Sequence, residues 1–216
     1  MQDQNKYSYY IEYNLPWTFA TKVVYTDNMK IDAAIILVGV KHSGKTTLGK
    51  NLADKLGIPF IDVDFVMTQI AGISPRDLYL MKGAVAFMQT EYMACQAIQK
   101  KYNGVPVVIA TGGGICDNPQ AMILLTTLGR FVMINSPVKL VCDRVFSKVS
   151  QLPDGTWQGL PAYVADKKPK DEAQAREIFT KIITERIENY KQIADRVFVP
   201  TKDSIEVNVN KLEEIL

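Results

Sequence analysis

Residues Gly39–Thr46 fit the pattern G-x-x-x-x-G-K-[ST] at every position. They follow a continuous apolar run, Ala33–Val38, and precede a stretch in which leucine recurs every fourth residue, Lys45–Leu56. A glycine-rich turn between a strand and a helix can direct several backbone N–H groups at one anion, and the helix N-terminus adds partial positive charge. The segment therefore predicts a phosphate-binding loop (P-loop).

The side chains of this loop have different expected roles. Lys45 is expected to reach the β- and γ-phosphates of ATP, and Thr46 to place its hydroxyl on a magnesium ion. His42 lies at a free position of the pattern, so we expect it to contribute only its backbone. The expected nucleotide contacts are Gly39, His42, Ser43, Gly44, Lys45, Thr46 and Thr47.

The chain from residue 33 onwards alternates between short apolar runs and helical segments. The expected strands are Ala33–Val38, Phe60–Val63, Val105–Ala110, Phe131–Ile134 and Arg196–Val199. The expected helices cover residues 45–56, 75–101 (one helix or two), 119–128, 137–149 and 171–194, with a further helix at the C-terminus. Strands separated by helices predict an α/β fold whose parallel sheet has helices on both faces and binds ligands at the carboxyl ends of its strands.

Polar or glycine residues stand at two of these expected strand ends. Asp62 and Asp64 are two residues apart, so on a strand they would point the same way, beside the P-loop. We assign Asp62 to magnesium, through water, and Asp64 to orienting or deprotonating an acceptor hydroxyl. Asp64 as a helix cap is the alternative. Gly112–Gly114 follow the third strand and allow close approach of a ligand, with a simple tight turn as the alternative.

Composition excludes several classes of function. Lys and Arg number 25 against 23 Asp and Glu, so the net charge of +2 predicts no nucleic-acid partner. No apolar run approaches the ~18 residues that would suggest a membrane span, and no signal peptide is evident. The three cysteines have no metal-binding spacing and are expected to be reduced thiols. These features predict a cytoplasmic protein without a nucleic-acid or membrane partner. The expected partner is a small-molecule substrate and the expected state is a monomer, although the sequence does not give the oligomeric state.

Taken together, these motifs resemble the shikimate kinase family over about residues 35–199. The matching features are the P-loop, residues 57–64, the spacing Gly72…Ser74…Gly83…Phe87…Glu91, Gly112–Gly114, and the spacing Arg186…Tyr190…Ala194-Asp195. The resemblance implies a three-layer P-loop kinase fold like that of nucleoside monophosphate kinases, with sheet order 2-3-1-4-5 and a mobile lid at about residues 150–170. It also implies magnesium-dependent transfer of the ATP γ-phosphate to the 3-hydroxyl of shikimate.

Family roles carry over at the residues that match. The resemblance assigns Asp64 to the acceptor hydroxyl, Gly112–Gly114 to substrate contact, Arg186 to the shikimate carboxylate and Arg144 to adenine. Arg186 also shares the apolar side of its helix with Tyr190, and a cation there needs an anionic partner. An internal salt bridge is the alternative to the substrate carboxylate as that partner. For Arg144 the alternative is a solvated helix position.

Two family arginines are missing, which leaves the acceptor open. Met88 stands where the family has a second carboxylate-binding arginine, and Gly159–Ala162 lacks the lid arginine. Possible substitutes are Arg76, Lys82, Lys167, Lys168 and Lys170. The sequence thus allows a shikimate kinase, a kinase of the same fold for another small hydroxylated acceptor, or a nucleotide-binding module with little transfer activity.

Residues 1–28 differ from the rest of the chain. They carry seven aromatic side chains and lack helical periodicity. We expect an accessory extension, or an upstream start used in place of Met29, with an aromatic docking arm as the alternative. Residues 29–216 are expected to form the kinase domain.

Overall fold

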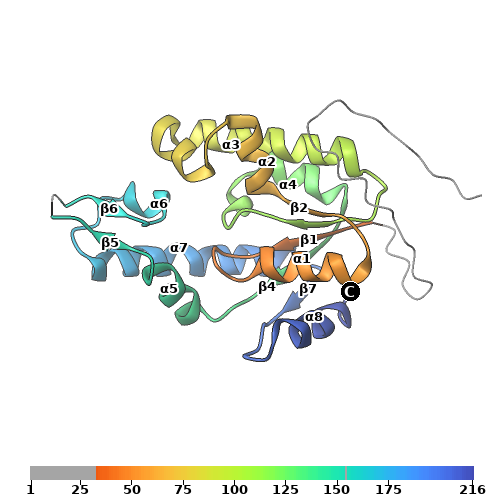
Figure 1. Ribbon diagram of the computed structural model, residues 1–216. Coiled ribbons are helices and arrows are strands. Elements are labelled where there is room, and N and C mark those ends of the chain that lie inside the picture. The colour runs from red at the N-terminus through yellow and green to blue at the C-terminus, as the bar shows by residue number, and fades with distance from the viewer. Residues whose placement is uncertain (1–32, 154) are drawn as a thin grey trace, which may run out of the picture.

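The computed structural model describes residues 33–153 and 155–216, which form a parallel sheet between two layers of helices (Figure 1). The main sheet contains β1 (Ala34–Val38), β2 (Phe60–Asp62), β3 (Val108–Ala110), β4 (Gly129–Ile134) and β7 (Arg196–Phe198). Its order is β2-β3-β1-β4-β7, and every neighbouring pair is parallel. The predicted strand order, 2-3-1-4-5, is therefore confirmed.

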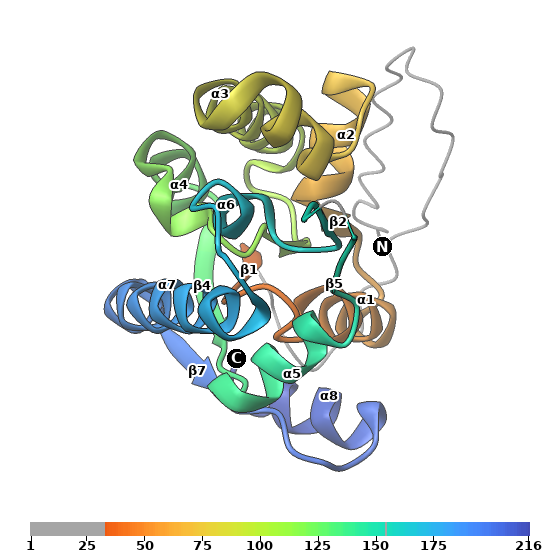
Figure 2. The same ribbon diagram turned by 90° about the vertical axis from the view of Figure 1, so that its left-hand side faces the viewer.

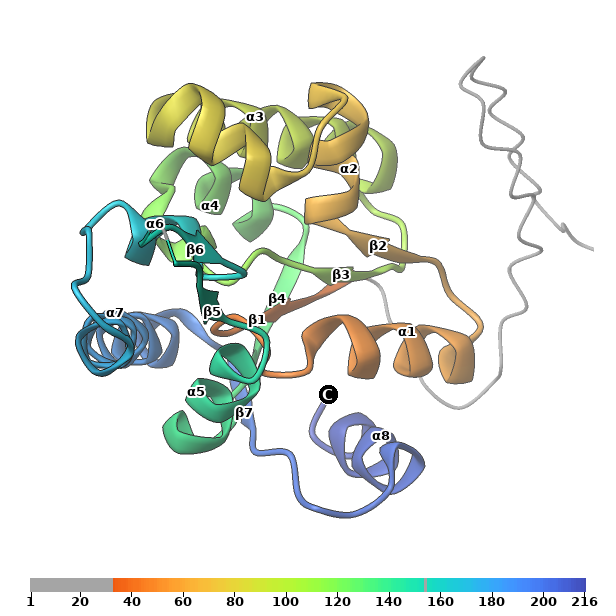
Figure 3. The ribbon, with the colours of Figure 1, turned by 60° about the vertical axis from the view of Figure 1, so that its left-hand side comes forward.

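The helices cover both faces of this sheet, as Figure 3 shows. They are α1 (Lys45–Leu56), α2 (Val63–Ala71), α3 (Pro75–Tyr102), α4 (Pro119–Thr126), α5 (Val138–Phe146), α6 (Ala162–Ala165), α7 (Glu172–Ile193) and α8 (Ile205–Glu213). Ile35 and Leu37 of β1 pack with apolar residues of α1 and α8. Ile36 and Val38 pack with those of α3, α4, α5 and α7. Both faces of β1 are thus buried, which explains its unbroken apolar sequence.

Short polar caps begin several helices where the sequence places them. The Ser74 hydroxyl accepts the backbone N–H of Asp77, and Pro75 follows it. Asn118 caps α4 through the N–H of Ala121. Inside α3, Gly83 has φ 80° and ψ 177°, so the predicted helix pair is two helical segments joined at a kink.

The end of β2 differs from the prediction. Strand geometry stops at Asp62, because its carboxylate accepts the backbone N–H groups of Asp64 and Phe65 and begins α2. Asp64 therefore lies in the first turn of a helix. The premise that Asp62 and Asp64 point the same way along a strand is wrong, and the cap of α2 is Asp62, not Asp64.

The segment expected to form a lid contains more regular structure than its loop-like sequence indicates. β5 (Ser150–Gln151) and β6 (Trp157–Gln158) form an antiparallel hairpin, and the short helix α6 follows. Strands of two residues are too short to produce an alternating pattern in the sequence. The hairpin and α6 lie at the carboxyl end of the main sheet, at the left of Figure 1 and in front in Figure 2.

The predicted extension, residues 1–28, lies outside the described residues. Among the helices of residues 33–153 and 155–216, none combines the length and apolar content needed to cross a membrane.

Candidate active site

The P-loop joins β1 to α1 in a conformation that depends on its glycines. Gly39 has φ 139°, and a Cβ there would lie 2.6 Å from the backbone oxygen of Ile134. Gly44 has φ 106° and begins α1. The Ser136 hydroxyl donates to the backbone oxygen of Ser43 over 2.8 Å, which fixes the loop against the end of β4. The loop is thus a preformed cradle that fits an anion.

Lys45 is buried at the base of this cradle. Its Nζ donates to the backbone oxygens of Gly39 and Val40, over 2.8 and 2.9 Å. Burial lowers the pKa of Lys45 to about 8, and the nearby carboxylates of Asp64 and Asp62 oppose that shift. A bound phosphate would supply further negative charge and favour the protonated lysine.

The Thr46 hydroxyl donates to Oδ2 of Asp62 over 2.9 Å. This pair joins the first turn of α1 to the end of β2. A threonine hydroxyl with a carboxylate beside it suits magnesium, which keeps most of its water ligands and binds few protein oxygens. Among the described residues no group of three His, Cys, Asp or Glu side chains is arranged to hold a metal alone. An ion here would therefore share its ligands between Thr46, water and phosphate.

A cavity of about 1050 Å³ extends from the P-loop to the lid segment. Most of the predicted site residues line it: His42, Ser43, Gly44, Lys45, Thr46, Thr47, Asp64, Gly112, Gly113, Gly114, Arg144 and Arg186. Gly39 and Asp62 are not among the lining residues, and Asp62 is linked to the wall through Thr46. The lid segment contributes Gly159, Tyr163 and Lys167, among others.

Asp64 and Glu91 flank Gly112 in this wall. A Cβ on Gly112 would lie 3.0 Å from Oδ1 of Asp64 and 3.2 Å from Oε1 of Glu91. Burial raises the pKa of Asp64, and the charge of Asp62 adds to the shift. Burial likewise raises the pKa of Glu91 to about 7, against the hydrogen bond from Asn118. Gly112 therefore allows two carboxyl groups of raised proton affinity to approach one point of the cavity.

Arg186 and Gly114 meet farther along the same wall. A Cβ on Gly114 would lie 2.8 Å from Nη2 of Arg186. Arg186 also makes a salt bridge to Asp117, with Nη2 2.7 Å from Oδ2. Both interpretations of Arg186 are therefore compatible with its position, because the internal ion pair is present and the side chain still lines the cavity.

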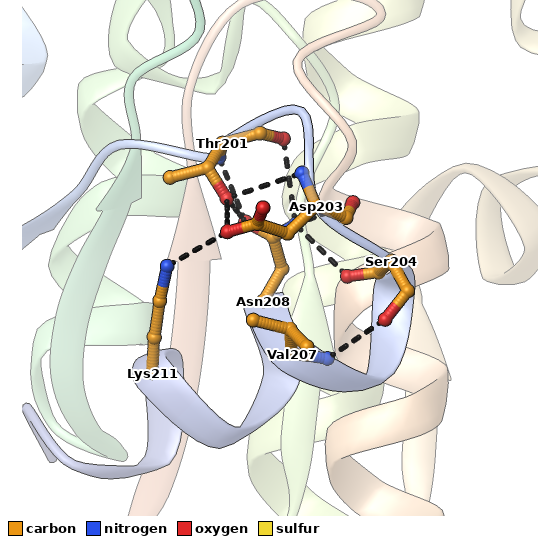
Figure 4. Close-up of polar contacts among 6 residues, drawn as sticks. All are labelled: Thr201, Asp203, Ser204, Val207, Asn208 and Lys211. Atoms are coloured by element: carbon orange, nitrogen blue, oxygen red, sulfur yellow. Dashed lines mark hydrogen bonds and ion pairs between the residues drawn. The ribbon is translucent and has the colours of Figure 1, made fainter.

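The loop after β7 also lines the cavity and is a part of the site that was not predicted from the sequence. Figure 4 shows this loop held by buried Asn208 of α8. Its side chain accepts the N–H of Thr201 over 2.8 Å and donates to the backbone oxygens of Asp203 and Ser204. Lys211 pairs with the Asp203 carboxylate. One signal in the sequence could have identified this loop. Asn208 falls on the buried side of an amphipathic helix, and a buried amide needs hydrogen-bond partners.

Arg144 of α5 contacts the P-loop at His42, and both residues line the cavity. Nη1 of Arg144 donates to the backbone oxygen of His42 over 3.0 Å. His42 has φ 60°, and burial, with the surrounding lysines and Arg144, lowers its pKa to about 4. The imidazole is therefore neutral at pH 7.

Comparisons with known proteins agree on one family. The sequence model for shikimate kinase matches residues 41–216. The shikimate kinase of Francisella tularensis subsp. novicida is 28% identical over 183 residues, which cover 84% of this chain and 93% of that protein. The shikimate kinase of Chlorobium chlorochromatii is 31% identical over 122 residues, 56% of this chain and 63% of that protein.

Solved structures show the same architecture. The shikimate kinase of Bacteroides thetaiotaomicron superimposes with a TM-score of 0.65 at 26% identity, covering 84% of this chain and 97% of that one. The shikimate kinase of Acinetobacter baumannii, solved in complex with shikimate, gives a TM-score of 0.67 at 22% identity, covering 84% and 91%. These likenesses support the P-loop kinase fold.

Proposed function

Because the chain belongs to the shikimate kinase family, whose members are ATP-dependent phosphotransferases with an alcohol acceptor, we propose that it phosphorylates the 3-hydroxyl of shikimate. The observation that carries the proposal is that Lys45 and Asp64 line one cavity. Lys45 belongs to the phosphate cradle, and Asp64 lies beside the glycines expected to contact the acceptor. A donor phosphate and an acceptor hydroxyl can therefore meet between them.

In the proposed reaction the acceptor oxygen attacks the γ-phosphorus of ATP. A new O–P bond forms, the bond from the γ-phosphorus to the bridging oxygen breaks, and ADP leaves with that electron pair. The Asp64 carboxylate accepts the hydroxyl proton and later releases it to water. Lys45 stabilises the negative charge on the transferring group, and the backbone N–H groups of the P-loop hold the remaining phosphates.

The other proposed ligand contacts follow from the cavity wall. Thr46, and Asp62 through water, would hold a magnesium ion, which supplies neutralising charge to the phosphates when bound. Arg144 and the loop after β7, which contains Thr201 and Asp203, would flank the adenine. The protein is further proposed to be a cytoplasmic monomer, and the free cysteines Cys95, Cys116 and Cys142 agree with a reducing compartment.

A coupled ADP-release assay tests this function. The protein is incubated with ATP, magnesium and one acceptor at a time: shikimate, quinate and a set of neutral polyols. We expect ADP release to depend on acceptor and to be fastest with shikimate. ADP release that is the same without acceptor, or that occurs only with another compound, would contradict shikimate as the substrate.

A second candidate is a kinase for another small hydroxylated acceptor. Two observations favour it. Met88 lines the cavity where the family has an arginine, and the retained Arg186 already faces the carboxylate of Asp117. Arg76 and Lys167 also line the cavity, so cations that could bind an anionic acceptor are present at other positions.

We further propose that residues 150–170 act as a lid. Binding of a non-hydrolysable ATP analogue together with shikimate is expected to slow amide hydrogen exchange in peptides from this segment. The reason is that closure orders the segment and keeps water from the γ-phosphate. Peptides from α4, which is outside the lid, serve as the internal control. Equal exchange in the lid peptides with and without ligands would argue against closure.

A further inference from the structure

Arg186 is largely enclosed by the protein's own groups. Its Nε and Nη2 both donate to Oδ2 of Asp117, over 3.0 and 2.7 Å. The guanidinium carbon lies 4.4 Å from the centre of the Tyr163 ring. The Arg186 side chain is 11% exposed, whereas that of Asp117 is 48% exposed. An aspartate at the rim of the cavity thus occupies one donor edge of the guanidinium, and an aromatic ring covers one face.

Within the described residues, the other two arginines that line the cavity, Arg76 and Arg144, donate to backbone oxygens elsewhere in the protein. Met88, on α3, is apolar, and Oε1 of the buried Glu91, three residues farther on, has no hydrogen-bond partner within the described residues. Arg76 donates through Nη1 to the backbone oxygen of Leu160 in the lid segment. The cavity wall around Arg186 therefore holds the carboxyl groups of Glu91 and Asp117, in addition to that of Asp64.

An acceptor carboxylate and the Asp117 carboxylate would compete for the same donors. A guanidinium binds a carboxylate best through two parallel N–H···O bonds, and here two of its N–H groups are already directed at Asp117. A second negative charge beside Asp117 would also be repelled by it. Tyr163 covers one face of the guanidinium, so an incoming anion has to approach from its remaining edge.

We propose that Asp117 is a specificity-determining residue, which competes with the acceptor for Arg186 and so disfavours acceptors that carry a carboxylate. The inference rests on the proposed function for the location of the acceptor, next to Gly112–Gly114. A competing Asp117 and a purely structural Asp117 predict opposite effects on carboxylate binding when the charge is removed. If Asp117 merely positions Arg186, removing its charge weakens carboxylate binding; if it competes, removing its charge strengthens it.

The test is the affinity of Asp117→Asn for shikimate, measured by calorimetry in the presence of ADP and magnesium. We expect the Kd to fall about ten-fold, since a freed charge-assisted interaction contributes about one decade. The Kd for shikimate methyl ester, which has no negative charge, should be the same in Asp117→Asn and in the wild type. The matched control is Asp143→Asn, which removes an aspartate 3.7 Å from Arg176 and outside the cavity wall. It should leave the Kd unchanged.

Unchanged or weaker shikimate binding by Asp117→Asn would overturn the inference. So would a fall in the Kd for the methyl ester as large as the fall in the Kd for shikimate. A thermal melt of each variant shows whether it is folded. If Asp117→Asn folds poorly, the same affinities are measured with Asp117→Ser. The proposed function is judged separately. If Asp117→Asn binds shikimate more tightly but neither it nor the wild type releases ADP with shikimate, the proposed acceptor is wrong and the competition by Asp117 is supported.

Discussion

Replacing Lys45 by alanine is expected to lower kcat by at least about 10²–10³-fold, because the substitution removes a preorganised charge from the transferring phosphate. The buried Nζ donates to the backbone oxygens of Gly39 and Val40, so a melt has to show that the variant keeps its fold without these two bonds. The measurement is ADP release at saturating ATP and acceptor, beside a circular dichroism melt.

The matched control is Lys50→Ala, which removes an exposed lysine from the same helix. It should retain wild-type kcat. The pH dependence adds a second readout. The pKa of Lys45 is about 8 in the free protein, so nucleotide binding by the wild type should weaken as the pH rises through that value and the lysine loses its proton. Near-normal turnover in Lys45→Ala would show that the P-loop lysine does not stabilise the transferring phosphate.

The strands and helices could be predicted because the relevant signals are local, whereas the order of the strands came from the family resemblance. The apolar run of β1 is buried on both faces, and Ser74, Asn118 and Asp171 cap the helices that follow them. These signals act within a few residues along the chain. The β5–β6 hairpin could not be predicted, since each strand has two residues and its pairing depends on the fold around it.

The candidate site was predictable to the extent that its residues are adjacent in the chain. The P-loop gives Lys45 and Thr46 directly. The pairing of Thr46 with Asp62 joins α1 to β2 and depends on strand order, which the family resemblance supplied. The contact of Arg186 with Asp117 links residues 69 positions apart, and no sequence pattern marks Asp117 as a partner.

One local misjudgement shows how capping competes with strand geometry. Two aspartates spaced by one residue fit a strand with both side chains on one side. Asp62 instead directs its carboxylate at the backbone N–H groups of the next turn, over 3.0 Å to Asp64, and strand geometry ends there. A short polar side chain favours this arrangement because free N–H groups at a helix start need acceptors.

The same geometry separates the expected roles of the two aspartates and leads to the prediction for Asp64→Asn. Asp62 is already bonded to Thr46 and to the start of α2, whereas the Asp64 carboxyl lies in the cavity wall beside Gly112. Asparagine preserves shape but cannot accept a proton from the acceptor hydroxyl. We expect kcat to fall about 10²–10⁴-fold, with the KM for ATP nearly unchanged. Steady-state kinetics against ATP and against acceptor separate the two effects.

The pH profile distinguishes a base from a residue that only shapes the cavity. The pKa of Asp64 is raised, mainly by burial, so wild-type kcat should decline as the pH falls through this raised value and the carboxylate gains a proton. The residual activity of Asp64→Asn should lack that decline. Asp54→Asn, on the exposed side of α1, is the control and should behave as the wild type does. If Asp64→Asn instead loses ATP affinity in proportion to kcat, Asp64 acts on the metal–nucleotide complex, and the division of roles with Asp62 is wrong.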